Sequence, residues 1–185
     1  MRKKLRAVDK SGWDIPKKTL IGVPWLLAHS LQRDGWTIRA DIIWNRVNAF
    51  VEPTARDRPY RQHEHVFLLS KSRFYSFDRK ALSEEDVWSI PIERRRSTNH
   101  NAFFPAELVE RCVLTGSPPG GVVLDPFVGS GTTMMVAAGL GRHSIGIELS
   151  DDYCDRTIEE LQQRGFRPDS WDRMRASISS EPESW

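Results

Sequence analysis

Two carboxylates and two glycines in the last third of the chain have the residue types and the spacing of a ligand site. Asp125 follows the apolar residues 122–124, and Glu148 follows a second apolar run. Between them lie Gly129 and Gly131, which allow a ligand to approach the backbone closely. A carboxylate at the end of a strand can accept hydrogen bonds from a hydroxyl or a cationic group. The combination predicts a binding site for a small molecule that carries such groups.

Three kinds of nucleotide-like ligand suit a glycine turn of this sort. A P-loop places a lysine after its last glycine to reach the phosphates, whereas this chain has Thr132 there. A dinucleotide fingerprint needs a third small residue, and no third glycine follows Gly131 at that spacing. An adenosine ligand without phosphate fits better, with Glu148 on the ribose hydroxyls. The plainer alternative is a tight turn with Asp125 and Glu148 as helix caps, and a pair of glycines alone would favour it.

The elements that position these residues are typical of a βαβ unit. A short buried strand is predicted over 122–125, a helix over 132–140, and a second parallel strand over 144–149. Another helix begins at an acidic cap and covers 151–164, and a helix over 105–115 precedes the unit. We therefore expect an α/β protein with a partial Rossmann-like fold.

The first half of the chain predicts a helix followed by an antiparallel hairpin. Apolar side chains at steps of three and four predict a helix over 19–35 that ends at Gly35. Residues 36–46 and 65–69 are rich in β-branched and aromatic types and predict two strands, the second extended by 74–77. Residues 78–101 have few apolar anchors and predict a long surface loop. The sheet is thus expected to be mixed.

Length and composition exclude several classes of protein. The 185 residues suffice for one domain, which we expect over 16–167, with flexible ends over 1–15 and 168–185. The longest apolar run, 20–28, is far short of the ~20 residues that span a bilayer, and no export signal is recognisable. The two cysteines give no disulfide framework and fit a reducing cytosol. A net charge of +2 does not indicate a nucleic-acid binder by itself.

Several spaced segments carry a resemblance to a known family. Residues 123–133 with Ile145–Glu148 and Tyr153 closely resemble the S-adenosylmethionine-binding motif of the N4-cytosine/N6-adenine DNA methyltransferases. Upstream segments agree in order with the permuted, beta-type members of that family: Thr19–Trp25, Gly35–Asn45, Asp57–Pro59, His63–Glu64, Val87–Trp88 and His100–Pro105. The resemblance covers about residues 16–165, and it is specific because several motifs agree.

The resemblance implies a site-specific DNA methyltransferase of a restriction-modification system, prokaryotic or phage-type and cytoplasmic. Its methyl donor would be S-adenosyl-L-methionine, its partner double-stranded DNA, and its target N6 of adenine or N4 of cytosine. Neither a metal nor a membrane is implied. Phe103 and Pro105 would wall the cofactor pocket, and they equally suit a hydrophobic staple and a helix start. The implied cofactor-binding residues of the glycine turn and the second strand are Asp125, Phe127, Gly129, Ser130, Gly131, Thr132, Thr133 and Glu148.

The family's catalytic motif has no counterpart here. This tetrapeptide, Asp/Asn/Ser-Pro-Pro-aromatic, holds the flipped target base, and in the permuted order it belongs upstream of Lys17, where only about 16 residues stand. Three partial matches fail: Asp57–Tyr60 has Arg for the first Pro, Ser117–Gly120 lacks the aromatic residue, and Asp125–Val128 belongs to the cofactor motif. We assign no catalytic residue. The strands that carry the motif should be missing too, which would expose an apolar sheet edge.

Two further groups of residues have two interpretations each. Arg94, Arg95 and Arg96 lie where the family places target recognition, so they either contact DNA or form a solvated charge run. His63 and His65 share a face of a strand, but no third ligand stands near them, which favours a structural role over a metal site. Glu64 between them is then expected to meet the basic loop.

Several origins and functions remain compatible with the missing motif. The chain can derive from a shortened reading frame, a decayed gene, or a split enzyme whose second chain carries the catalytic motif. The alternative function is that of a non-catalytic remnant that binds S-adenosylmethionine or DNA as a partner subunit. An RNA or small-molecule methyltransferase is disfavoured by the DNA-family segments between Pro24 and His100. Target base, recognition sequence and oligomeric state stay open.

Overall fold

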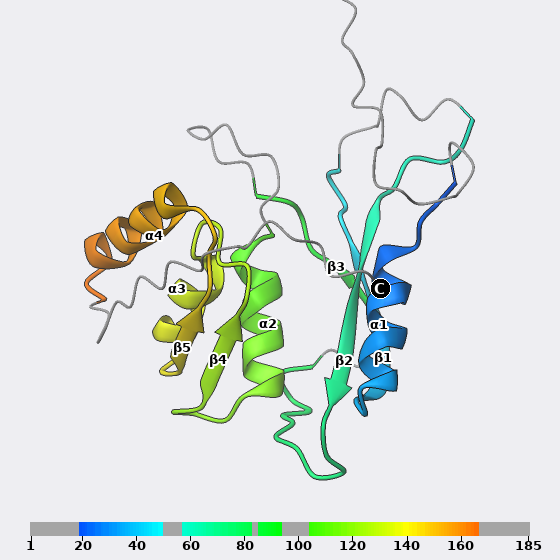
Figure 1. Ribbon diagram of the computed structural model, residues 1–185, viewed down its shortest axis with the longest axis horizontal. Coiled ribbons are helices and arrows are strands. Elements are labelled where there is room, and N and C mark those ends of the chain that lie inside the picture. The colour runs from blue at the N-terminus through cyan, green and yellow to red at the C-terminus, as the bar shows by residue number, and fades with distance from the viewer. Residues whose placement is uncertain (1–18, 50–56, 83–84, 94–103, 167–185) are drawn as a thin grey trace, which may run out of the picture.

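The computed structural model describes residues 19–49, 57–82, 85–93 and 104–166. The helices and strands of this part of the chain form two groups that lie side by side (Figure 1). The described residues contain no helix long and apolar enough to cross a membrane. In chain order the elements are α1 Val23–Arg33, β1 Thr37–Asn45, β2 His63–Ser70, β3 Val87–Ser89, α2 Ala106–Gly116, β4 Val122–Asp125, α3 Thr132–Gly139, β5 His143–Gly146 and α4 Asp151–Gln163.

The first group is a three-stranded mixed sheet with the order β2-β1-β3. Strands β1 and β2 form the expected antiparallel hairpin, and β3 joins β1 in parallel. Because side chains alternate between the faces of a strand, Ile42 and Trp44 point to one face, where α2 packs through Leu108. On the other face, Trp25 of α1 contacts the rings of His65 and Phe67 on β2. The sheet is therefore covered by a helix on each side.

Strand β3 corrects the prediction of a long surface loop over 78–101. Trp88 and Ile90 are only 2% and 0% exposed, and both belong to the core of the first group. Ile90 also accepts a hydrogen bond from the indole nitrogen of Trp44, at 2.8 Å between Nε1 and O. A segment with few apolar residues looks like a loop, yet two large side chains suffice to bury it. The expected strand extension over 74–77 is wrong as well, since no strand forms there and Phe74 is exposed.

Helix α1 begins at Val23 and not at residue 19 as predicted, and the conformation of the backbone explains the difference. Gly22 takes a left-handed conformation with φ 73° and immediately precedes the helix, whose first turn contains Pro24. Proline is common in the first turn of a helix, because it lacks the amide that would be unpaired there. Glycine takes the left-handed conformation before the helix at little steric cost. Gly35 follows the helix with φ 87°, as predicted for its end.

The second group is the predicted βαβ unit. Strands β4 and β5 pair in parallel, from Val122 opposite His143 to Asp125 opposite Gly146. Helix α3 connects the two strands and α4 follows β5, so the prediction of strand, turn, helix, strand and helix is confirmed, with every boundary within three residues. Gly146 has room for no side chain, because an added Cβ would collide with Val128 and Met134. Its face of the small sheet is thus closely covered by α3 and the loop before it.

The opposite face of the second group is bare. Val122 and Leu124 are each 60% exposed, and Ile145 and Ile147 are more than half exposed. Parallel sheets are normally buried on both faces, so four exposed apolar side chains on so small a sheet are unusual. These side chains belong to a face of the sheet, so the expectation of an exposed apolar edge stays a prediction. Among the described residues the strands form two sheets, not one continuous sheet.

Candidate functional site

The turn after β4 is shaped by the carboxylate that ends the strand. Asp125 accepts a hydrogen bond from the amide of Phe127, at 2.9 Å between Oδ1 and N. This contact to the backbone two residues ahead is an Asx turn, and it holds the chain in a tight bend. The Phe127 side chain stands 84% exposed beside the bend. Asp125 therefore has one oxygen in the turn and its second oxygen available at the end of β4.

Glu148 links the second strand to the glycine turn. Its Oε2 accepts a hydrogen bond from the Gly129 amide at 2.9 Å, while Oε1 accepts from the amides of Leu149 at 2.9 Å and Ser150 at 3.0 Å. Partial burial by itself would raise the pKa of Glu148, but the hydrogen bonds from Ser150, Gly129 and Leu149 lower it below the ordinary value. The carboxylate is thus charged at neutral pH and fixed in position.

The two glycines of the turn serve different purposes. Gly131 has φ 75°, and a Cβ there would lie 2.5 Å from the Cγ2 methyl of Thr157 on α4. Gly129 has φ 53° and more space, and its carbonyl accepts a hydrogen bond from the Thr157 hydroxyl at 2.9 Å. Gly131 is therefore required for the close packing of α4, whereas Gly129 offers open backbone. Thr157 was not predicted from the sequence, because a threonine inside a helix gives no local signal.

The structure brings four of the predicted residues together and separates others from them. Asp125, Gly129 and Gly131 belong to the turn that follows β4, and Glu148 joins them from the end of β5 through its hydrogen bond from the Gly129 amide. Thr132 is buried, and Ser130 lies 3.2 Å from it between the two hydroxyl oxygens. The alternative of a tight turn capped by the two carboxylates is also supported in part, since Asp125 and Glu148 both accept hydrogen bonds from backbone amides of the turn.

Other predicted residues lie elsewhere or outside the described residues. Thr133 faces α2 and lines an apolar groove together with Phe104. Pro105 is fully buried and immediately precedes α2, so its role as a helix start is confirmed and its predicted place in the wall of a cofactor pocket stays a prediction. Phe103 and the three arginines of the basic loop, Arg94, Arg95 and Arg96, fall outside the described residues.

The histidine pair of β2 has partners other than a metal. His65 lies 3.0 Å from the carboxylate of Asp41, between Nδ1 and Oδ1, and its ring contacts Trp25. Glu64 forms an ion pair with Arg46 at 3.3 Å, which is a partner on the chain just after β1 and not on the basic loop. In the described part of the chain no three metal-ligating side chains come together. These contacts support a structural role for the pair.

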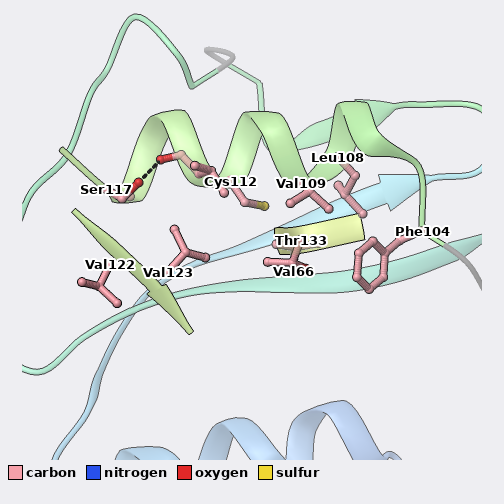
Figure 2. A pocket seen from close by; sticks show the side chains of 11 residues that line it. Val66, Phe104, Leu108, Val109, Cys112, Ser117, Val122, Val123 and Thr133 are labelled. Carbon is pink, nitrogen blue, oxygen red and sulfur yellow. Dashed lines mark hydrogen bonds between the residues drawn. The ribbon is translucent and has the colours of Figure 1, made fainter. Parts of the chain in front are cut away.

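An apolar groove was not predicted from the sequence. It has a volume of about 410 Å³ and lies between α2, β4 and β2. Side chains from all three contribute to its lining, among them Val66, Cys112 and Val123 (Figure 2). Desolvation by the apolar lining raises the pKa of the Cys112 thiol to about 11 although the residue as a whole is exposed, and this effect outweighs the neighbouring Arg111. The groove could not be foreseen, because its lining comes from segments that are far apart along the chain.

Comparisons with known proteins identify the family of the chain. Residues 13–160 match the family described as DNA methylase, N6_N4_Mtase. The chain is 46% identical over 159 residues to the Type II methyltransferase M.SmaI of Serratia marcescens, an alignment that covers 80% of this chain and 54% of that protein. It is 43% identical over 155 residues to the Type II methyltransferase M.Cfr9I of Citrobacter freundii, covering 78% and 51% respectively.

Solved structures share the fold. The cytosine-N4-specific PvuII DNA methyltransferase superposes with a TM-score of 0.67 at 21% identity, over 77% of this chain and 58% of that one. TTHA0409 of Thermus thermophilus, in complex with S-adenosyl-L-methionine, gives a TM-score of 0.61 at 27% identity, over 78% and 61%. The chain spans about half the length of the curated relatives it matches. With four-fifths of its residues inside the family match, the chain belongs to the N6/N4 DNA methylase family.

Proposed function

We propose that this chain is the cofactor-binding part of a DNA amino-methyltransferase that uses S-adenosyl-L-methionine. One observation carries the proposal: two partly buried carboxylates, Asp125 and Glu148, meet an open glycine backbone where two parallel strands end. Ligands of open α/β sheets bind at the carboxyl ends of the strands. TTHA0409, a relative in fold, was solved with this cofactor bound.

Each residue of the site can take a defined part in binding. A carboxylate offers about four acceptor positions, and three of those of Glu148 are occupied by backbone amides. The remaining capacity suits a ribose hydroxyl. The second oxygen of Asp125 suits the ammonium group of the methionine part, and the exposed ring of Phe127 suits an apolar or aromatic surface of the ligand. Ser130, Thr132 and Thr133 would shape the turn around it.

The proposed reaction is methyl transfer to an exocyclic amine of DNA, either N6 of adenine or N4 of cytosine. When bound, S-adenosyl-L-methionine supplies an electrophilic methyl group, which passes to the amine nitrogen as its bond to sulfur breaks and the amine loses a proton. The amine is a weak nucleophile, so acceptor groups must engage its N–H bonds. None of the three partial matches to the catalytic tetrapeptide supplies them, and we assign no catalytic residue to this chain.

Double-stranded DNA is the proposed substrate and the cytoplasm the proposed location, and the names of the relatives as Type II methyltransferases of bacteria support both. Arg94, Arg95 and Arg96 are proposed to contact its phosphates, because guanidinium groups bind phosphate oxygens with little dependence on sequence. The catalytic motif would come from a polypeptide segment outside residues 1–185. A second candidate is a non-catalytic subunit that binds the cofactor or DNA, and it is favoured by the missing motif.

Calorimetric titration with S-adenosyl-L-methionine tests the cofactor site. We expect binding by the native chain and at least about tenfold weaker binding by Asp125→Ala and Glu148→Ala, since a lost charged hydrogen bond costs on the order of 1.5–3 kcal/mol. Asp152→Ala is the matched control, because it removes an equal charge from the exposed first turn of α4. Unchanged affinity in both site variants would overturn the assignment of the site.

Radiolabelled methyl transfer to DNA tests whether this chain carries catalytic groups of its own. The isolated chain is expected to give no incorporation above a Gly131→Trp control, whose side chain would fill the turn and displace α4. Incorporation above that control would show that the chain carries catalytic groups after all. Methylation of RNA but not of duplex DNA would contradict the proposed substrate.

A further inference from the structure

Two hydrogen bonds hold the backbone of Gly129 in the glycine turn. Its amide donates to Oε2 of Glu148 at 2.9 Å, and its carbonyl accepts from the hydroxyl of Thr157 on α4, also at 2.9 Å. The amide belongs to the peptide plane before the Cα atom, and the carbonyl belongs to the plane after it. Because φ and ψ are the only soft backbone dihedrals of a residue, the two contacts together fix the conformation of Gly129.

Gly129 depends on these two contacts because packing restrains it little. It has φ 53°, and the place where a Cβ would stand has, apart from the adjoining residues, only the Phe127 carbonyl oxygen within 4 Å in the described structure, at 3.8 Å. Glycine loses more conformational freedom on ordering than any other residue. The hydrogen bonds to Glu148 and Thr157 therefore order this part of the turn before a ligand arrives.

Thr157 contacts the turn with both branches of its side chain. The residue is buried, and its single hydroxyl donor serves a carbonyl 28 positions earlier in the chain and not one of its own helix. The Cγ2 methyl faces Gly131, where an added Cβ would lie 2.5 Å away. The hydroxyl restrains Gly129 and the methyl packs beside Gly131, so the two branches have separate roles that substitutions can distinguish.

Helix α4 is anchored to the same carboxylate that binds the turn. Ser150 immediately precedes the helix, and its amide donates to Oε1 of Glu148 at 3.0 Å. The carbonyl of Ser150 accepts from the amide of Cys154 at 3.0 Å, within the first turn of α4. The hydrogen bonds thus form a closed ring from Gly129 to Glu148, along the start of α4, and back through Thr157. The place of Thr157 is therefore fixed relative to the turn.

We propose that Thr157 is a positioning residue of the cofactor site, whose hydroxyl fixes the peptide between Gly129 and Ser130 so that S-adenosyl-L-methionine meets the glycine backbone in one conformation. The inference deepens the proposed function and rests on it, because Thr157 acts on the ligand only through the turn. Without the hydroxyl, Gly129 has to be ordered as the cofactor binds, and the cost of that ordering lowers the affinity.

Calorimetric titration of two variants separates the role of the hydroxyl from that of the methyl. Thr157→Val keeps the branched shape and loses the donor, whereas Thr157→Ser keeps the donor and loses the methyl. We expect about tenfold weaker binding of S-adenosyl-L-methionine by Thr157→Val and an affinity within about twofold of the native value for Thr157→Ser, the size expected for one hydrogen bond. Equal affinity of the native chain and Thr157→Val, or equal losses in both variants, would overturn the proposal.

Thr115→Val is the matched control, because it also removes a buried threonine hydroxyl from a helix. Thr115 lies on α2, and its hydroxyl donates to the Arg111 carbonyl of the same helix at 2.7 Å. This variant should bind the cofactor as the native chain does, and circular dichroism checks that every variant is folded. A loss of affinity in Thr115→Val as large as that in Thr157→Val would contradict a specific role for Thr157.

Hydrogen exchange of the Gly129 amide, followed by nuclear magnetic resonance, measures the restraint without cofactor. The amide should exchange at least about tenfold faster in Thr157→Val than in the native chain, because the peptide next to it is no longer held. Thr157→Ser should keep the native rate. The amide of Ile43, which donates to the Asp86 carbonyl in the first group, is the internal reference. An unchanged rate at Gly129 in Thr157→Val would overturn the proposal.

The two measurements distinguish a failure of this inference from a failure of the proposed function. A native chain that does not bind S-adenosyl-L-methionine contradicts the proposed function, and the exchange rates then still decide whether Thr157 restrains the turn. A native chain that binds the cofactor no better than Thr157→Val contradicts the positioning role alone.

Discussion

The two sheets of this protein differ in how their faces are covered. The β2-β1-β3 sheet has α1 on one face and α2 on the other, and its core holds Trp44, Trp88 and Ile90. The β4-β5 sheet has α3 on one face, while Val122 and Leu124 on the other are more exposed than buried. The first sheet is a finished hydrophobic unit. The β4-β5 sheet carries the candidate cofactor site and is covered on only one face.

This difference shows that the local geometry of the candidate site can form even though the sheet that carries it is covered on one face only. The turn at Asp125 and the bridge from Glu148 to Gly129 need only residues 125–157, and they form although one sheet face is bare. Apolar surface left in water does not contribute its burial energy, so the second sheet should depend on a partner for stability. Four substitutions sharpen this contrast.

The largest effect is expected in the covered sheet. Trp88→Ala should lower the free energy of unfolding by about 3–5 kcal/mol, because it removes a fully buried aromatic side chain and leaves a cavity. It also removes the ring that Arg111 covers at 5.3 Å. Urea denaturation followed by circular dichroism measures the change. A loss below about 1 kcal/mol would mean that the first sheet is not the stable unit described here.

A substitution in the glycine turn should act next most strongly. Gly131→Val places a β-branched side chain at φ 75° and against Thr157, so we expect a loss of about 3 kcal/mol or displacement of α4. Gly165→Val is the control, since it shares the left-handed conformation, with φ 83°, but meets no neighbouring atom. Thermal unfolding of the two variants separates the collision from the backbone strain. Equal losses would show that the packing of α4 on the turn contributes little.

Acidification should weaken the bridge made by Glu148. Its folded pKa is lowered, so its contribution to stability is fully present above the ordinary value of 4.5 and is lost as the pH falls through the lowered pKa. The difference in melting temperature between the native chain and Glu148→Gln should therefore shrink on going from pH 7 to pH 3. A difference that grows over this range would contradict the hydrogen-bonding pattern of the carboxylate.

The smallest effect is expected on the bare face. Leu124→Ala should change the unfolding free energy of the isolated chain by less than about 0.5 kcal/mol, because the side chain is mostly in water already. Urea denaturation of the native chain and of the variant measures the change. A large loss in the isolated chain would mean that Leu124 is covered there.

Much of the second group could be predicted because its signals are local. The apolar run 122–125, the glycine turn and the acidic start of α4 each lie within a few residues, and their periods and caps specify the elements directly. The first group was predicted less well. Trp88 and Ile90 were assigned to a surface loop because their burial depends on Trp44 and Leu108, which stand far away in the chain. The contact of Thr157 with the glycine turn and the apolar groove could not be predicted from the residues next to them in the sequence.

The sequence by itself determined the family, the βαβ unit and the four residues that converge at its end, because motif spacing and backbone propensity act over short distances. Tertiary structure decided what those residues do to one another: the carboxylates bind the turn, Gly131 admits α4, and among the described strands β4 pairs with β5 alone. Packing joins segments that are distant along the chain, and the free energy of burial depends on which surfaces actually meet. The bare face of the β4-β5 sheet is therefore visible only in the structure, as apolar surface left uncovered.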